Sequence, residues 1–219
     1  MSEMVVATKR FEKISPEKRA AILEAARDEF SRNGFEQSSL NEILKTAGIS
    51  KGSFYYYFED KVDLYATTIT EALGPYLIRL DEVCNVDTPD AYWEELEDYI
   101  RETVEELYRN PELIRLGKGL VQLKMSSLQP QGITDLVTLS RSKIATLVER
   151  GRRAGAITTD IPDDLLVNIL TGIDEALDYW SFEHVETLSL LDVEGHTLFF
   201  LKLFKLIAET HIQNSPGRL

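Results

Sequence analysis

Cysteine is almost absent from this 219-residue sequence, and long apolar runs are absent altogether. Because Cys84 stands alone, no internal disulfide can form, which suits a reducing compartment. The longest uninterrupted apolar run, from Phe54 to Phe58, has five residues, whereas a bilayer-spanning helix needs about 18 or more. No apolar segment follows the basic residues near the start, so we expect no secretory signal. These absences predict a cytoplasmic protein with no membrane partner.

Motifs of the common enzyme and metal-binding families are missing as well. The chain contains no CxxC, HExxH or GxGxxG motif and no phosphate-binding P-loop. Its histidines, His184, His196 and His211, have no metal-ligand spacing. The acidic pair Asp163-Asp164 is typical of a helix start rather than of a catalytic pair. We therefore expect neither catalysis nor a bound metal or cofactor.

The charge is strongly negative on average but unevenly distributed. The chain has 24 basic and 37 acidic side chains, a net charge of −13, which by itself disfavours a nucleic-acid partner. Residues 1–60, however, carry 9 basic and 10 acidic side chains, whereas residues 61–219 carry 15 and 27. The acidity therefore belongs to the second part, and the near-neutral first part is compatible with DNA binding.

Alternating strand patterns are scarce, whereas helical spacing of apolar residues recurs along the chain. Ser15-Pro16 is typical of a capped helix start, and Asn33-Gly34 of a helix end. Two short helices follow, over about 39–48 and from residue 51 onward, and longer ones over about 60–84, 89–109, 111–127, 132–154, 162–186 and 190–212. We expect an all-α fold with three helices in residues 1–60 and a larger helical body in residues 61–219.

The turn at residues 47–50 joins the second and third predicted helices in the manner of a helix-turn-helix motif. At 100° per residue, the third helix directs Phe54, Tyr57 and Phe58 to one side. Its opposite face is first small and then phenolic: Gly52, Ser53, Tyr55 and Tyr56. Such a face suits the DNA major groove, with basic residues at either end for phosphate contacts: Lys51 and Lys61. The alternative is that the three consecutive tyrosines serve only core packing. A core, however, does not require the outward-facing pair Tyr55 and Tyr56.

Many fixed spacings run through this segment, which reads Phe30-x-x-x-Gly34-Phe35-x-x-Ser38-Ser39-x-x-x-Ile43-x-x-x-Ala47-Gly48-Ile49-Ser50-Lys51-Gly52-Ser53-Phe54-Tyr55-x-Tyr57-Phe58-x-x-Lys61-x-x-Leu64. It resembles the DNA-binding domain of TetR/AcrR-type transcriptional regulators over roughly residues 15–65. Two positions depart from the family pattern, since Leu44 stands where alanine is frequent and Ser39 where threonine is frequent. Neither change alters the helix capping or the core packing expected of this segment.

The resemblance implies a homodimeric prokaryotic repressor that binds a palindromic operator in double-stranded DNA. It implies that residues 61–219 form an effector-binding and dimerisation domain, in which a small molecule changes the spacing of the two DNA-reading heads. Carried over by position, the family's DNA contacts fall on Ser38 or Ser39, Lys51, Gly52, Ser53, Tyr55, Tyr56 and Lys61. The sequence also allows a DNA-binding regulator that answers to a protein partner instead of a small molecule.

A short basic segment precedes the first predicted helix. It and the start of that helix carry five cations: Lys9, Arg10, Lys13, Lys18 and Arg19. An arm of this kind can touch DNA phosphates or the minor groove. The alternative is a terminal tail without any DNA contact.

The predicted helix over about 162–186 carries one apolar stripe, whereas the last, over about 190–212, is apolar over so wide an arc that it must be buried on two sides. The family pairs these helices between subunits in a four-helix bundle. We therefore predict these dimerisation residues: Ile173, Leu177, Trp180, Phe199, Phe200, Leu203, Phe204 and Ile207. A monomer core is the alternative explanation of the same pattern.

Aromatic and acidic residues of the helical body are the candidates for effector binding: Tyr92, Trp93, Tyr99, Asp174 and Asp178. Carboxylates beside aromatic rings can recognise a cationic, lipophilic compound. The alternative is that the rings belong to the core and the acids to a solvated edge. Cys84, which the pattern places on a helix, is expected to be a packing residue.

Overall fold

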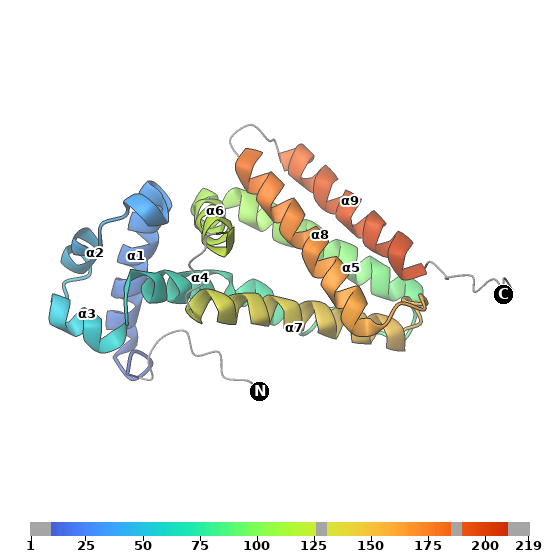
Figure 1. The fold of residues 1–219 in the computed structure, drawn as a ribbon, viewed down its shortest axis with the longest axis horizontal. Helices are drawn as coiled ribbons and strands as arrows, with labels where there is room; N and C mark the ends of the chain where they lie inside the picture. The colour runs from blue at the N-terminus through green and yellow to red at the C-terminus, as the bar shows by residue number, and fades with distance from the viewer. Residues whose placement is uncertain (1–9, 126–130, 185–189, 210–219) are drawn as a thin grey trace, which may run out of the picture. The chain divides into compact units, whose positions relative to one another are not determined.

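The computed structural model describes residues 10–125, 131–184 and 190–209, and in these ranges it is all-helical, as predicted. Figure 1 shows the helices, which are α1 (Pro16–Gln37), α2 (Leu40–Thr46), α3 (Lys51–Tyr57), α4 (Lys61–Arg79), α5 (Pro89–Arg109), α6 (Pro111–Met125), α7 (Gln131–Arg153), α8 (Asp163–His184) and α9 (Leu190–Glu209). Residues 126–127, 185–186 and 210–212, which we predicted to be helical, lie outside the described residues. None of the described helices combines the length and the apolar content that crossing a bilayer requires.

The chain forms two compact units. The first comprises Met1–Tyr76 and Leu107–Leu139, and the second comprises Leu77–Glu106 and Ser140–Leu219. All three boundaries between these segments fall inside helices, so α4, α5 and α7 each contribute residues to both units. The first unit extends beyond residues 1–60 because side chains of α4, α6 and α7 complete its core: Leu64, Tyr65, Leu116 and Leu136. The functional division into DNA-binding and effector-binding parts remains a prediction.

Local signals explain the helices of the first unit. The Ser15 side chain caps α1, which starts at Pro16. Gly34 interrupts its helical geometry with φ of 67°, a left-handed value that glycine adopts without steric cost, which confirms the helix break predicted there. The buried Tyr65 hydroxyl donates to the Leu116 carbonyl at 2.6 Å. This approach requires Gly119, because a Cβ there would lie 2.2 Å from the Tyr65 hydroxyl oxygen.

In the second unit, the turn after α4 differs from the prediction. Helix α4 ends at Arg79 and not near residue 84, and Cys84 has φ of 61°. The Arg150 guanidinium of α7 stabilises the turn after the helix, because it donates to the carbonyls of Leu80 at 2.9 Å, Asp81 at 2.6 Å and Val83 at 2.5 Å. Cys84 is buried in the core, as expected of a packing residue, but it lies in this turn and not on a helix.

Candidate nucleic-acid interface and ligand cavity

Helices α2 and α3 are fixed by their caps and by the turn between them. The Ser39 hydroxyl caps α2, and the Ser50 hydroxyl accepts the Ser53 amide at 3.1 Å to cap α3. Gly48 lies in the turn with φ of 66°, and the next amide, that of Ile49, donates to the Leu44 carbonyl at 3.0 Å. The sequence therefore sets the start of α3 through local hydrogen bonds.

The two faces of α3 match the helical-wheel prediction. Phe54, Tyr57 and Phe58, the last just beyond the helix end, are buried in the core of the first unit. Tyr55 and Tyr56 are 55% and 54% exposed. The small and basic residues at the helix start are also accessible: Lys51, Gly52 and Ser53. Within the described part of the chain, the outer face of α3 is therefore exposed and its inner face is packed in the core.

Sequence reasoning missed Phe11, which joins the N-terminal segment to α3. Its side chain is fully buried, and its ring centroid lies 4.7 Å from that of Phe58 and 6.1 Å from that of Tyr57. Arg10, the preceding residue, is exposed, and its guanidinium lies 4.6 Å from the centroid of the Tyr56 ring. The available signal was one large apolar side chain among the charges of residues 9–13. Lys9 lies outside the described residues.

Two predicted DNA contacts have internal roles instead. The Lys61 ammonium donates to the carbonyls of Phe35, Ser38 and Glu36 at 2.7, 3.2 and 3.4 Å. Burial lowers the pKa of Lys61. Ser38 is buried, and its hydroxyl donates to the Phe35 carbonyl at 2.7 Å. Because both side chains bind carbonyl groups at the end of α1, neither is retained as a proposed DNA contact. Ser39 stays a candidate, since its side chain is partly exposed.

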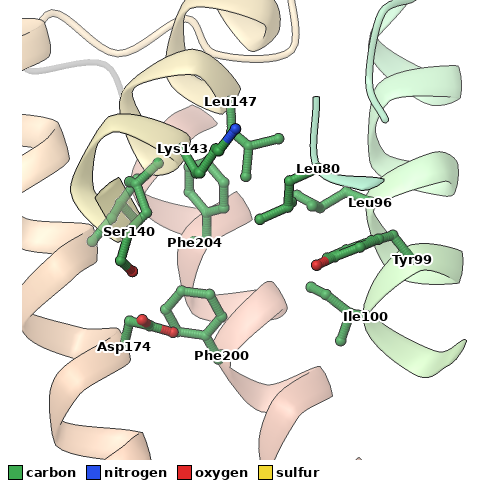
Figure 2. A pocket seen from close by; sticks show the side chains of 12 residues that line it. Leu80, Leu96, Tyr99, Ile100, Ser140, Lys143, Leu147, Asp174, Phe200 and Phe204 are labelled. Atoms are coloured by element: carbon green, nitrogen blue, oxygen red, sulfur yellow. The ribbon is translucent and has the colours of Figure 1, made fainter. Parts of the chain in front are cut away.

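The second unit contains a cavity of about 220 Å³, lined by α5, α7, α8 and α9 and by Leu80 of the turn after α4. Its walls are mostly apolar, and Figure 2 shows the Tyr99 hydroxyl and the Asp174 carboxylate directed toward the same space. Lys143 and Ser140 of α7 are the other polar lining residues, and sequence reasoning did not find them. Nothing in the local pattern of α7 distinguishes these positions from an ordinary polar face.

Of the five predicted effector residues, the structure brings two to this cavity, Tyr99 and Asp174. Asp178 instead lines a neighbouring pocket of about 90 Å³, which Asp174 also lines. Tyr92 and Trp93 belong to the core and not to the cavity wall. The Tyr92 hydroxyl donates to the Leu147 carbonyl at 3.1 Å, and the Trp93 ring packs 5.2 Å from that of Phe204.

The ionisable residues of the cavity have close electrostatic neighbours. The Lys143 ammonium pairs with the Asp81 carboxylate at 2.5 and 2.6 Å, and 14% of its side chain is exposed. Burial is the main cause that raises the pKa of Tyr99; a side-chain hydrogen bond with Thr103 and the Arg79 guanidinium lower it, and the Asp174 carboxylate raises it. Among the described residues, no group of three His, Cys, Asp or Glu side chains could hold a metal ion.

An apolar groove of about 430 Å³ lies on one face of α8 and α9, which run side by side (Figure 1). Its lining includes five predicted dimerisation residues: Ile173, Leu177, Phe199, Phe200 and Leu203. Phe199 is 60% exposed, and Trp180 of α8, which does not line the groove, is also exposed. Phe204 does not lie on this face, contrary to its prediction as a dimerisation residue. It is buried in the monomer core, where its ring packs against Trp93. Ile207 is partly buried and packs against the same core.

Comparison with known proteins gives matches to bacterial regulators. The family model described as bacterial regulatory proteins, tetR family, matches residues 22–68. The transcriptional regulator RutR of Escherichia coli K12 is 35% identical over 162 residues, which are 74% of this chain and 74% of RutR. The Bacillus subtilis fatty acid metabolism regulator protein is 34% identical over 61 residues, but this match spans only 31% of its length. The match to the Brucella suis repressor BepR likewise spans 35% of that protein.

Solved structures share the fold at lower identity. The regulator FadR from Bacillus subtilis, in complex with stearoyl-CoA, has a TM-score of 0.67 and 22% identity, covering 87% of this chain and 98% of FadR. A complex of SmeT with triclosan has a TM-score of 0.66 and 17% identity, covering 93% of this chain and 99% of SmeT. SmeT is the repressor of a Stenotrophomonas maltophilia multidrug efflux pump.

Proposed function

Because the chain belongs to the tetR family of bacterial regulatory proteins, we propose that it is a homodimeric cytoplasmic repressor. It binds a palindromic operator in double-stranded DNA and is released by a small-molecule effector. The single observation that supports this most is the outer face of α3, where Tyr55 and Tyr56 are exposed while the inner face is buried.

The proposed DNA contacts lie on that face and at the start of α2: Ser39, Lys51, Gly52, Ser53, Tyr55 and Tyr56. A seven-residue helix with small residues first can lie in the major groove, where Tyr55 and Tyr56 reach base edges or phosphates. The Lys51 ammonium adds a phosphate contact. With a net charge of −13, the whole chain has weak non-specific attraction to DNA, so binding depends on the docked heads and declines with salt.

The proposed dimer buries the groove face of α8 and α9. One three-helix head reads only a half-site, so two heads must be held about one DNA turn, ~34–36 Å, or a multiple of it apart. The exposed Phe199 and its neighbours Ile173, Leu177 and Leu203 form the apolar patch that pairing would cover. Phe199 is exposed and the other three are half-buried, and an accessible apolar patch of this kind is typical of an interface.

A small molecule is favoured over a protein partner as the effector. The second unit contains a cavity lined from four helices and a turn, which is the feature that separates the two hypotheses. The FadR structure is a complex with stearoyl-CoA and the SmeT structure a complex with triclosan, so proteins of this fold do hold small molecules. In this chain α4, α5 and α7 contribute residues to both compact units. A ligand that repacks the side chains around the cavity can therefore affect the first unit through these helices.

The experiment that tests the function is selection of bound sequences from a random double-stranded DNA pool, followed by affinity measurement on the enriched site and on a scrambled one. We expect an enriched palindrome bound at least ~1,000-fold more tightly than the scrambled DNA. Lys51→Ala should lose affinity for the palindrome, whereas Arg141→Ala removes one exposed cation from α7 and should not. Equal affinity for both DNAs would refute the proposal.

A further inference from the structure

The N-terminal segment that precedes α1 is folded onto the first unit. The Lys13 amide donates to the Arg10 carbonyl at 3.3 Å, which closes a turn at the start of the described chain. Two apolar side chains anchor this turn. Phe11 is fully buried, with its ring centroid 4.7 Å from that of Phe58, and Ile14 packs against the same core. The backbone of Arg10, the residue before the buried ring, is therefore held beside the end of α3.

Two of the five cations predicted for a DNA-binding arm have partners within the first unit. The Arg19 guanidinium forms an ion pair with the Glu71 carboxylate of α4, so its charge is balanced inside the protein. The Lys18 ammonium donates to the hydroxyl of Tyr57 at 3.2 Å, which directs it toward an inward-facing residue of α3. Both cations are thus engaged in holding the first unit together.

Arg10 has a different contact, which lies on the outer face of α3. Its side chain is exposed, and its guanidinium lies over the ring of Tyr56 at 4.6 Å from the centroid. Tyr56 is itself exposed on the proposed reading face. A cation within about 6 Å of an aromatic face is attracted by the ring, and this attraction uses none of its N–H donors. The planar fork of guanidinium donors stays available for phosphate oxygens, whose geometry it matches.

Arg10 also supplies the positive charge that the end of α3 otherwise lacks. Lys51 lies exposed at the start of the helix. The sequence predicted Lys61 for the opposite end, but its ammonium donates to three carbonyls at the end of α1. Tyr56 follows Lys51 by five residues, about 7.5 Å along the helix axis, so a cation over its ring lies near the last turn of α3. The outer face of α3 therefore has a cation at each end.

We infer that Arg10 binds a DNA phosphate beside the end of α3, opposite the phosphate contact proposed for Lys51. This rests on the proposed function, in which the outer face of α3 reads the operator. Phosphate contacts carry no base information, but they fix the register and the orientation of the reading helix on the duplex. The guanidinium over Tyr56 thus supplies affinity and helps to align a residue that reads the groove.

The salt dependence of DNA affinity tests this contact, measured with the full-length protein on the selected palindrome and on scrambled DNA. Arg10→Met removes the charge and keeps a long side chain beside the Tyr56 ring. Loss of one phosphate contact should reduce the slope of log affinity against log salt by about 0.9 and weaken binding to both DNAs. Between about 50 and 200 mM salt, the native protein should then lose about 3.5-fold more affinity than the variant.

Two further variants separate the phosphate contact from packing on the ring and from the overall charge. Arg10→Lys keeps the charge and should keep the native slope. Arg141→Met removes one exposed cation from α7, and it should change neither the slope nor the affinity. An unchanged slope in Arg10→Met, or a slope reduced equally in Arg10→Lys or in Arg141→Met, would overturn the inference.

The same titrations separate this inference from the function on which it rests. If Lys51→Ala weakens binding to the palindrome and Arg10→Met does not, the result supports the operator function and contradicts the role of Arg10. If the native protein binds both DNAs equally and Arg10→Met still reduces the slope, the phosphate contact is supported and the operator function is contradicted. Failure of the native protein to bind either DNA would contradict both.

Discussion

Replacing Phe11 by alanine should destabilise the first unit far more than its place near the chain start suggests. The side chain is fully buried, its ring packs on Tyr57 and Phe58, and the Arg19 guanidinium lies 5.7 Å from its centroid. Truncation of a buried phenylalanine costs about 3–5 kcal/mol, because apolar contacts are lost and a cavity remains. That is a large part of the ~5–15 kcal/mol stability of a typical domain.

The loss should appear in urea unfolding followed by circular dichroism at 222 nm, with Glu12→Ala as the exposed neighbouring control. Operator affinity should fall as well, at temperatures where the variant is folded, because Phe11 supports the inner face of α3 and positions Arg10. A destabilisation below about 1 kcal/mol, no larger than that of Glu12→Ala, would refute the reasoning that Phe11 belongs to this core.

Four further predictions concern other sites. Tyr56→Ala should weaken operator binding by about tenfold or more in a gel-shift titration and leave the dimer intact in sedimentation analysis; unchanged affinity would remove Tyr56 from the reading face. Lys61→Met should lower the melting temperature, since three carbonyls lose their hydrogen bond to the Lys61 ammonium, and a loss of operator affinity without any loss of stability would restore Lys61 as a DNA contact. Phe199→Asp should give a folded monomer, whereas Phe204→Asp should prevent folding because Phe204 is in the core; a folded Phe204→Asp dimer would contradict this distinction. Burial raises the pKa of Asp63 from its ordinary value of 3.8 to about 6, so the folded protein binds this proton more tightly than the unfolded chain, and the resulting stability is lost as pH rises from about 4 through 6. Asp63→Asn should flatten that part of the profile of unfolding free energy against pH, and an unchanged profile would contradict the assignment.

The local features of the fold could be predicted from the sequence because their causes are local. Ser15 with Pro16 at the start of α1, Gly34 with its left-handed φ, and the two faces of α3 depend on caps, steric limits and helical period. The helical wheel alone therefore predicted correctly that Tyr56 is exposed and Phe54 is buried.

The remaining features depend on contacts between segments that the sequence places far apart. The Lys61 ammonium donates to the carbonyl of Phe35, which lies 26 positions earlier in the chain, and a helical pattern cannot predict a contact of that separation. Helix α9 is apolar on several sides, so its pattern could not show that Phe204 faces the monomer core and Phe199 does not. The cavity is even harder to predict from the sequence, because Leu80, Tyr99 and the other lining residues come from five separate elements.

The most direct test of the central claim, that two identical heads read one symmetric operator, is a hydroxyl-radical footprint on the selected DNA. The account predicts two protected regions related by two-fold symmetry, with centres about one DNA turn or a multiple of it apart, ~34–36 Å per turn. Both regions should lose protection together in Tyr56→Ala and in the monomeric Phe199→Asp. A single asymmetric region, or protection that Phe199→Asp leaves unchanged, would contradict it.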